Sequence, residues 1–322
     1  MARFHGVWPA MPSPLTEDFE VDAEGTANVV NWLIENGVHG ISALGSTGEC
    51  AGLSKQQRRD LLKATIDAAD GRVPVMGGAN GTHYADVVAD LEMCGEVGAV
   101  GALTPPPFYY PLETRGVIDW FTSLADESPV PIFLYHIPRM TKVAISVEAV
   151  EELARHDNIV GLKDSDGQLA FFSEVARIGN EVDDFSAFTG SDAMLYPALC
   201  VGGHGIIGAH VNVVPDVERA IYDAFKDGDH EKAVALQRDV VRTGPVPRVG
   251  NFPAGIKGSL AARGLCGPTM TRPIRASASG SVVELGDAMV ESGITRKEAV
   301  AGRLDGPHPQ PPSPTASRGE AE

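Results

Sequence analysis

The segment Ile159-Val160-Gly161-Leu162-Lys163-Asp164-Ser165 is a short apolar run that ends in a charged pair. Such a run, bounded by turn residues, is typical of a buried strand. Lysine is seldom buried without a specific role, and burial penalises its charged ammonium form. A neutral amine at the end of a strand is a nucleophile for carbonyl carbon and can form a Schiff base. The segment makes Lys163 a candidate Schiff-base lysine, a role that the segment alone does not favour and that depends on what the other strand ends supply. A side chain that extends to solvent or pairs with Asp164 is the alternative.

Seven further apolar runs accompany this segment. They are near-continuously apolar rather than alternating, as expected for strands covered on both faces. The expected strands are Val7–Met11, Gly40–Leu44, Val73–Gly77, Ala99–Thr104, Pro131–Ile137, Ile159–Lys163, Phe185–Gly190 and Gly205–Gly208. Helical spacing between or after them is found at Gly25–Asn36, Ser54–Ala69, Thr82–Cys94, Glu113–Ala125, Val147–Arg155, Leu169–Ile178 and Val217–Lys226.

Repeated strand–helix units predict the α/β class and a (β/α)8 TIM barrel. A doubly wound open sheet competes with it, but no Gly-x-Gly-x-x-Gly follows the first strand. Further helices are expected at His230–Val241, Pro253–Arg263 and Val282–Ala301. We therefore expect a catalytic barrel over residues 1–228, a C-terminal helical extension over 229–305 and a disordered tail over 306–322, where Pro, Ser, Gly and Glu dominate.

The composition narrows the possible partners. The 322 residues carry a formal net charge of −17, which argues against nucleic acid and against anionic lipid as partners. The N-terminal residues lack the apolar core of a signal peptide, and no apolar stretch is long enough for a membrane span. The four cysteines form no C-x-x-C pair, so that neither a zinc site nor a disulfide framework is indicated. We expect a cytoplasmic protein with reduced thiols.

The carboxyl ends of the strands hold the candidate functional groups, because active sites of such barrels lie there. Gly45-Ser46-Thr47-Gly48 is a turn with free backbone N–H groups and two hydroxyls, which suits a small carboxylate or phosphate. A plain strand-to-helix turn is the alternative. Tyr135 ends a strand and is either a proton carrier beside the amine or a structural tyrosine with its hydroxyl at the rim.

Two histidines near these strand ends are better explained as structural. His136 and His204 have no carboxylate or second histidine at metal-ligand spacing, so that a hydrogen-bonded structural role is favoured for both. Glu49 is expected to support its loop or to begin the next helix, where negative charge is favourable. No metal and no cofactor is expected.

Taken together, these segments resemble the dihydrodipicolinate synthase / N-acetylneuraminate lyase family, whose members are pyruvate-linked class I aldolases and related lyases on a (β/α)8 barrel. The resemblance covers roughly residues 5–275, in family order and spacing. The matching segments are Gly45-Ser46-Thr47-Gly48-Glu49, Tyr135-His136-Ile137-Pro138, Val160-Gly161-Leu162-Lys163-Asp164, Gly190-Ser191-Asp192 and Gly203-His204-Gly205-Ile206-Ile207.

The resemblance implies the chemical roles. Lys163 would form the Schiff base with the ketone of pyruvate or of another 2-keto acid. The protonated imine would then withdraw electrons while a C–C bond breaks or forms at the neighbouring carbon. Tyr135 would shuttle the proton. Ser46 and Thr47, with their backbone amides, would hold the pyruvate carboxylate, and the carbonyl of Ile207 would lie near the bound keto acid.

The resemblance also implies an assembly. Members of the family are often homotetramers built as dimers of dimers, so that a homo-oligomer is expected here. Thr47 would link Tyr135 to a tyrosine from a neighbouring subunit. Tyr109 best fits that tyrosine, and Tyr110 comes next.

One departure from the family bears on the substrate. The synthase branch carries an arginine shortly after Tyr-x-x-Pro, where it holds the carboxylate of aspartate semialdehyde. Here the run is Pro138-Arg139-Met140-Thr141-Lys142, and the matching position is Met140. Arg139 stands one place early and is expected to point elsewhere, although Arg139 or Lys142 could still reach in. This favours a lyase of a sugar-derived 2-keto acid such as 2-keto-3-deoxygluconate.

Three alternatives stay open. The first is dihydrodipicolinate synthase itself, which condenses pyruvate with aspartate semialdehyde. The second is a dehydratase or decarboxylating relative that uses the same imine. The third is a non-catalytic regulator that binds keto acids, and Lys163 together with Tyr135 argues against it.

Overall fold

A computed structural model of the chain describes residues 4–245, 252–276 and 279–294. Within these ranges eight parallel strands lie in the order β1-β8-β7-β6-β5-β4-β3-β2. Ala10 and Ser42 form a parallel bridge between the ends of the series, so that the sheet closes into a barrel. The strands are β1 Gly6–Pro9, β2 Ile41–Ser42, β3 Val75–Gly78, β4 Ala102–Thr104, β5 Ile132–His136, β6 Ile159–Asp164, β7 Ser186–Thr189 and β8 Gly205–Gly208.

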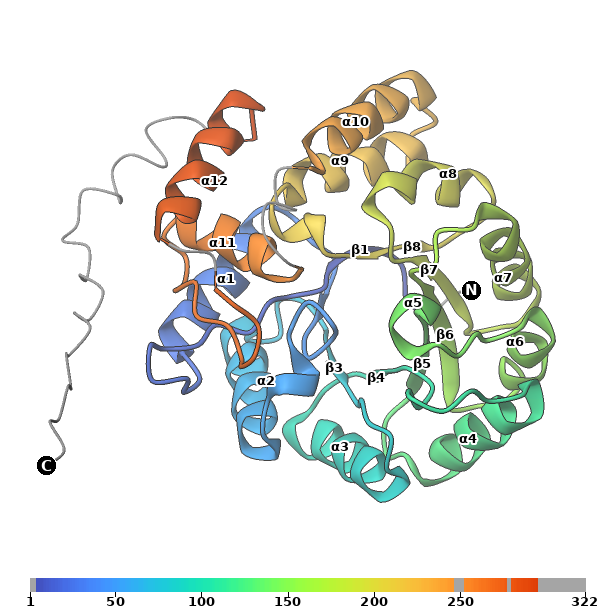
Figure 1. Ribbon diagram of the computed structural model, residues 1–322. Helices are drawn as coiled ribbons and strands as arrows, with labels where there is room; N and C mark the ends of the chain where they lie inside the picture. The colour runs from blue at the N-terminus through green and yellow to red at the C-terminus, as the bar shows by residue number, and fades with distance from the viewer. Residues whose placement is uncertain (1–3, 246–251, 277–278, 295–322) are drawn as a thin grey trace, which may run out of the picture.

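Helices surround this barrel as an outer ring (Figure 1). The ring helices are α1 Ala23–Glu35, α2 Lys55–Ala69, α3 Tyr84–Val97, α4 Thr114–Glu127, α6 Val147–Leu153, α7 Leu169–Glu181, α8 Leu195–Cys200 and α9 Pro215–Lys226. The helices α5 Pro138–Thr141, α10 His230–Thr243, α11 Ala254–Ala262 and α12 Ser279–Glu291 are additions to this ring. The predicted (β/α)8 barrel is confirmed. The short helices α5 and α8 were not predicted, because a helix of four to six residues is too short for a periodic apolar pattern.

Local sequence explains where the ring helices begin. Ser54 caps α2 by accepting a hydrogen bond from the Gln57 N–H, and the Gln57 side chain accepts one from the Ser54 N–H in return. Asp22 caps α1 in the same position by accepting from the Gly25 N–H. Each cap satisfies N–H groups that have no partner within the helix.

The barrel interior is a core of its own, separate from the layer between strands and helices. It contains Trp8, Phe133, Phe188 and Ile207, and aromatic rings in it meet edge to face. Because side chains of a strand alternate between the two faces, these residues fill the inside while their neighbours pack against the ring of helices. The filled interior forms a floor beneath the carboxyl ends of the strands.

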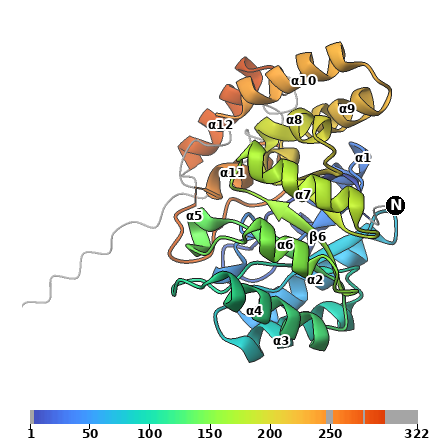
Figure 2. The same cartoon turned by 90° about the vertical axis from the view of Figure 1, so that its right-hand side faces the viewer.

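The C-terminal helices α11 and α12 extend toward one end of the barrel. Figure 2 shows α11, α12 and the short α5 toward the end opposite the N-terminus. Since α5 directly follows β5, this is the end where the strands finish. The division into a barrel over 1–228 and an extension over 229–305 stays a prediction, and the expected tail over 306–322 lies outside the described residues. Within the described parts, no helix has the length and apolar character needed to span a membrane.

Candidate active site

Lys163 and Tyr135 lie side by side at the carboxyl end of the barrel. They are register partners on β6 and β5, so that both side chains point to the same, inner face. The Lys163 Nζ lies 4.5 Å from the centre of the Tyr135 ring. Lys163 is 4% exposed and Tyr135 3% exposed. The amine is therefore sheltered from bulk water and faces a phenol, as the sequence predicted for this pair of strand ends.

The electrostatic surroundings favour the ionised phenol. Burial raises the pKa of Tyr135 and is the largest single influence on it, yet the resulting pKa lies below the ordinary tyrosine value. The positive charge of Lys163 and hydrogen bonds with Ser46, Ser165 and Lys163 outweigh the burial. A phenol in such surroundings can give up and recover a proton beside the amine.

The segment Gly45-Ser46-Thr47-Gly48-Glu49, here called the hydroxyl loop, reaches this pair from β2. The Ser46 Oγ lies 3.5 Å from the Tyr135 hydroxyl, and Thr47 is buried. Gly48 is needed because a Cβ there would lie 3.0 Å from the Met11 carbonyl oxygen. The structure thus brings Ser46 and Thr47 to the same end of the barrel as Lys163.

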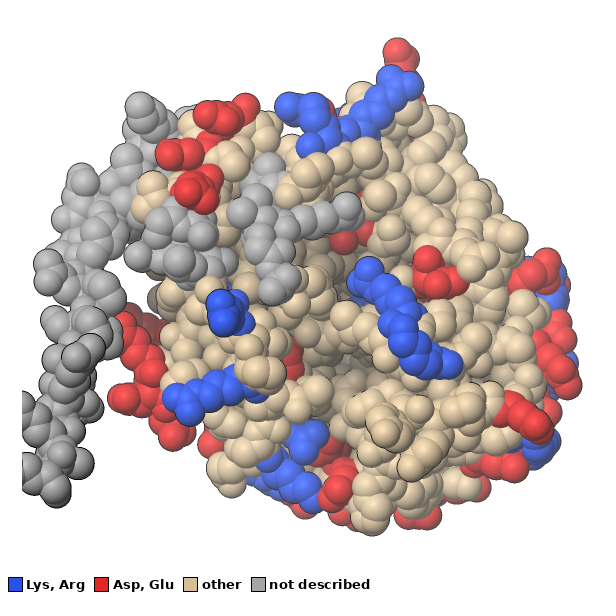
Figure 3. All heavy atoms as spheres, in the orientation of Figure 1, with Lys and Arg blue, Asp and Glu red and all other residues tan. Residues whose placement is uncertain are grey.

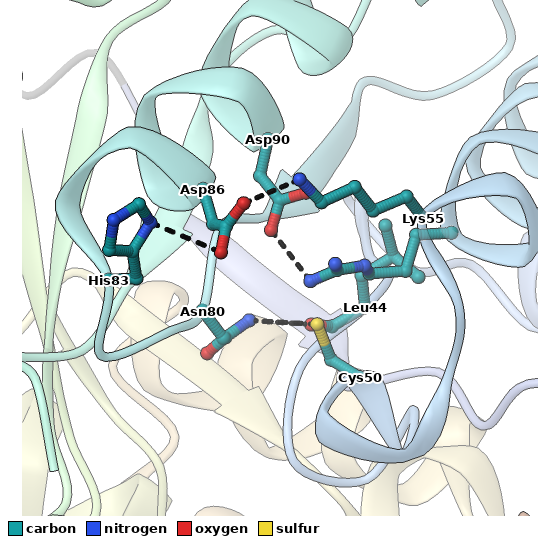
Figure 4. A network of polar contacts seen from close by, with 8 residues as sticks. Leu44, Cys50, Lys55, Asn80, His83, Asp86 and Asp90 are labelled. Carbon is teal, nitrogen blue, oxygen red and sulfur yellow. Dashed lines mark hydrogen bonds and ion pairs between the residues drawn. The ribbon is translucent and has the colours of Figure 1, made fainter.

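Asn80, which follows β3, supports the hydroxyl loop from behind. Its Nδ2 donates to the Leu44 carbonyl at 3.0 Å and to the Cys50 Sγ at 3.2 Å (Figure 4). Leu44 has a positive φ of 59°, so that the chain turns sharply where the loop begins. The amide thereby holds the two ends of the loop together.

Ion pairs between α2 and α3 continue this support outward. The Lys55 Nζ lies 2.5 Å from an Asp86 carboxylate oxygen, and His83 approaches the same carboxylate from the other side (Figure 4). The more buried Arg58 pairs with Asp90 at 2.7 Å. Burial raises the pKa of Asp90 to about 6, although the Arg58 charge opposes that rise. These contacts fix α2 against α3, and with them the segment that carries the hydroxyl loop.

A pocket of about 640 Å³ opens above Lys163, here called the central pocket. Its walls include Thr47, Tyr135, Arg139, Lys163, Ser165 and Asp192. Figure 3 shows a hollow at the centre of this face, with basic side chains over α5 at its rim. Apolar residues of the C-terminal part, among them Val241 and Phe252, complete the wall. The pocket is large enough for a small organic acid beside the amine.

The expectation that Arg139 points elsewhere is wrong. Arg139 lines the central pocket, whereas Met140, at the position that matches the family arginine, is 46% exposed. The reason is local, because Pro138–Thr141 form the helical turn α5 instead of an extended segment. This turn places Arg139 over the mouth of the barrel.

Asp192 is a fixed part of the opposite wall. Its Oδ1 accepts hydrogen bonds from the backbone N–H groups of His210 and Val211, at 2.9 and 3.2 Å. The Gln237 side chain donates to its carbonyl oxygen at 2.9 Å. A carboxylate held in this way keeps one position when a ligand enters.

A second polar pair lies behind the first, on the outer face of the same two strands. His136 Nδ1 and Asp164 Oδ1 are 2.8 Å apart, both side chains are buried, and the His136 ring packs 4.4 Å from that of Phe171. His204 Nδ1 accepts a hydrogen bond from the Ala187 backbone N–H at 3.0 Å. Both histidines are hydrogen-bonded parts of the scaffold, as the sequence favoured.

Three of the predicted site residues, Ser46, Ile207 and Tyr109, are not among the pocket walls, although Ser46 lies beside the Tyr135 hydroxyl. Ile207 is fully buried in the barrel interior, next to Tyr135 in the same core, and its side chain is not among the pocket walls. Tyr109 is 81% exposed and has a positive φ of 90°, which is uncommon for a residue with a side chain. It borders a separate hollow of about 570 Å³ together with Tyr110, Phe108 and Leu112. Within one chain, Tyr109 therefore does not meet Lys163.

Three residues of importance to the site were missed or undervalued. The position of Arg139, one place before the family arginine, gives no sign that it lines the pocket, and Ser165 follows Lys163 without a distinguishing pattern of its own. Lys257 is the third, the only charged residue of the small and apolar helix α11, and it contacts Glu49 of the hydroxyl loop. A lone charge in such a helix is the signal that would have found it. Among the described side chains, no cluster of three His, Cys, Asp or Glu is arranged as metal ligands.

Comparison with known proteins identifies relatives over most of the chain. The model of the dihydrodipicolinate synthetase family matches residues 3–289. A 4-hydroxy-tetrahydrodipicolinate synthase of Methanoculleus marisnigri is 36% identical over 256 residues, which cover 76% of this chain and 87% of that protein. An uncharacterized DapA-like lyase of Halobacterium salinarum is 33% identical over 274 residues, or 84% of this chain and 88% of the relative.

Solved structures agree with these matches. YagE, a prophage protein of the dihydrodipicolinic acid synthase family from E. coli K12 solved in complex with pyruvate, aligns with a TM-score of 0.86 at 27% identity and covers 91% of this chain and 100% of its own. A dihydrodipicolinate synthase from Aquifex aeolicus aligns with a TM-score of 0.84 at 28% identity, covering 90% of this chain and 99% of its own. The family that the strand-end segments resemble is the one that the comparisons find.

A substitution at Gly190 tests how closely the chain packs around the Lys163 amine. A Cβ at this position would lie 2.0 Å from the Ser165 Oγ and 2.9 Å from the Lys163 Cε. We expect Gly190→Ala to displace the Lys163 side chain and to slow its reductive alkylation by a small keto acid about 10²-fold. Peptide mass spectrometry measures this rate. Gly267→Ala, where the nearest atom is 3.5 Å away, is the control. Equal rates in both variants would contradict the close packing around Lys163.

Proposed function

The chain belongs to the dihydrodipicolinate synthetase family of lyases, and from this premise we propose that it is a Schiff-base-forming class I lyase that acts on pyruvate-derived 2-keto acids. The observation that carries the proposal is the pairing of a buried Lys163 with Tyr135, 4.5 Å from amine to ring centre, under an open pocket. The pocket also holds Arg139, a cation that suits anionic substrates.

The proposed reaction proceeds through covalent catalysis at Lys163. The neutral amine attacks the keto carbon of the substrate, water leaves, and an imine forms. Once protonated, the imine accepts the electron pair of the C–C bond that breaks, while the hydroxyl on the departing carbon gives its proton to the Tyr135 phenolate, which yields an enamine and an aldehyde. Protonation of the enamine carbon and hydrolysis of the imine then release pyruvate and restore the amine. The reverse sequence condenses pyruvate with an aldehyde.

Tyr135 is proposed as the proton carrier of these steps. Its ring lies against Lys163 and its hydroxyl lies near Ser46, so that it can reach the oxygen that leaves as water. The lowered pKa of the phenol makes transfer in both directions easier. Ser46 and Thr47 are proposed to hold the keto-acid carboxylate, because the hydroxyl loop supplies hydroxyl and N–H donors beside the pair.

Trapping with pyruvate tests the covalent step. Incubation with pyruvate and borohydride is expected to add a pyruvate-derived mass at Lys163, read by peptide mass spectrometry. Lys163→Ala is expected to abolish turnover while circular dichroism stays unchanged. Tyr135→Phe is expected to slow turnover by ~10²–10⁴-fold, the usual contribution of general acid–base catalysis. Pyruvate release by Lys163→Ala at the normal rate would end the proposal.

The exposed aromatic surface around Tyr109 supports a homo-oligomer. Phe108, Tyr109, Tyr110 and Leu112 are 39, 81, 72 and 37% exposed, an unusual group of large side chains in contact with water. We propose that a second copy covers this surface and that Tyr109 enters its central pocket near Tyr135. The strained φ of Tyr109 fits a residue whose position is set by a partner.

Sedimentation measurements and kinetics of tyrosine variants test this assembly. The protein is expected to sediment as a dimer or tetramer, and Leu112→Glu is expected to yield monomers. Tyr109→Phe is expected to keep the assembly and to slow turnover on the order of 10²-fold. Tyr110→Phe is the matched control. Loss of activity in Tyr110→Phe alone would assign the role to Tyr110, and a monomeric active protein would refute the shared site.

The aldehyde portion of the substrate has two candidates. The sequence favours a sugar-derived compound such as 2-keto-3-deoxygluconate, and the hydroxyls of Ser165 and Ser191 on the pocket wall suit it. Arg139 on the same wall favours the second candidate, a 4-hydroxy-tetrahydrodipicolinate synthase activity with aspartate semialdehyde, whose carboxylate an arginine can bind. The relatives named as such synthases fit this alternative.

Arg139→Gln distinguishes the two candidates. If the aldehyde substrate carries a carboxylate, the KM for that aldehyde is expected to rise about tenfold or more in Arg139→Gln. The rate at which borohydride traps the imine of Lys163 with pyruvate is expected to stay unchanged. Met140→Ala, at the exposed neighbour, is the control and is expected to change neither value. Pyruvate release from 2-keto-3-deoxygluconate and condensation with aspartate semialdehyde are the two assays. An unchanged KM for aspartate semialdehyde in Arg139→Gln would remove the argument for the synthase.

A further inference from the structure

Lys257 is a buried charge outside the proposed chemistry. It is 0% exposed and lies in α11, whose other residues are small or apolar. Burial lowers the pKa of Lys257, and the charge of Glu49 opposes that change. A lysine in such a place is retained for a specific partner.

That partner belongs to the hydroxyl loop. The Lys257 Nζ lies 2.5 Å from the Glu49 Oε1, and both side chains are completely buried. The same amine donates to the Thr269 carbonyl at 2.6 Å. The second Glu49 oxygen accepts from the Thr271 N–H at 2.7 Å and from its Oγ1 at 3.0 Å. The carboxylate thus ties the loop after β2 to a segment more than two hundred residues later.

The two segments lie side by side in the fold. Figure 1 shows the chain after α11 lying over the segment that leads into α2. Close packing accompanies the ion pair, since a Cβ on Gly52 would lie 2.3 Å from the Thr271 Oγ1. Glu49 itself has a positive φ of 55°, so that its backbone alone does not favour the observed turn. The contacts with Lys257 and Thr271 are the interactions that bind the Glu49 side chain in this conformation.

Stability alone does not account for a buried ion pair. Apolar residues of similar volume often stabilise a folded protein as much as a buried ion pair or more, because burying the ion pair takes two charges out of water. An ion pair does fix a position and an orientation, which apolar contacts define less sharply. Glu49 stands two residues after Thr47, so that its position sets where the hydroxyls and N–H groups of the loop face the pocket.

We propose that Glu49 and Lys257 are positioning residues, which hold the hydroxyl loop ready for the carboxylate of the keto acid. The inference rests on the proposed function, because it takes Ser46 and Thr47 as the carboxylate anchor. The C-terminal segment from α11 to Thr271 thereby becomes part of the substrate-binding machinery, although Lys257 itself is too deeply buried to touch substrate.

The test compares two carbonyl compounds at Lys163. The rate of imine trapping by cyanoborohydride is measured against concentration, first with pyruvate and then with acetone, which lacks the carboxylate. In Glu49→Gln the concentration of half-maximal trapping by pyruvate is expected to rise about tenfold or more. Trapping by acetone is expected to stay within about twofold of wild type, since the amine itself is unaffected. A purely structural defect would slow both compounds equally and would overturn the inference.

Companion variants separate folding from positioning. Glu49→Gln combined with Lys257→Met removes both buried charges, and Thr271→Val removes only one hydroxyl donor, so that at least one folded variant carries the test. Each variant is expected to weaken the binding of pyruvate but not the trapping of acetone. Asp67→Asn, which breaks the exposed Lys63–Asp67 pair, is the control and is expected to change nothing. Unchanged pyruvate affinity in the folded variants would overturn this inference alone. If pyruvate and cyanoborohydride did not label Lys163 in the wild-type protein, the proposed function would be overturned as well.

Discussion

The contact between Lys163 and Tyr135 is the one on which the site depends. Parallel pairing of β5 and β6 makes the two residues register partners, and strand alternation directs both to the inner face. The filled interior beneath them keeps water away from one side, while the pocket leaves the other side open. An amine and a phenol in this arrangement exchange protons over a short path, which is what imine chemistry requires.

The hydroxyl loop is held from two directions. On one side Asn80 bonds to Leu44 and Cys50, and ion pairs between α2 and α3 fix the surrounding helices. On the other side Glu49 is bound by the C-terminal segment. A glycine-containing turn is flexible by itself, so that outside contacts must supply its rigidity. Rigid donors cost less to align with a ligand than mobile ones, which is the physical benefit of this double support.

The electrostatics of the pocket contrast with those of the whole chain. The net charge is −17, yet Lys163 and Arg139 both face the central pocket. An acidic surface repels anions at long range, although salt screens that repulsion beyond roughly 10 Å. The Arg139 guanidinium and the amine of Lys163 act at short range, where burial reduces screening. The proposed selectivity for a small organic anion would therefore depend on these two residues inside the pocket, with Asp192 on the opposite wall as the balancing charge.

The sequence by itself determined the barrel and the strand ends that carry Lys163 and Tyr135, because apolar periodicity and the alternation of strands and helices are local properties. The joint role of Lys163 and Tyr135 came from the resemblance of several strand-end segments to one family. Tertiary structure alone decided the place of Arg139. The sequence spacing indicated a side chain that points away from the pocket, but the helical turn α5 directs it toward the pocket. It also decided the partner of Glu49, which depends on how α11 packs against a loop far away in the chain. Long-range contacts of single charged residues leave no periodic trace in a sequence, whereas repeated apolar burial does.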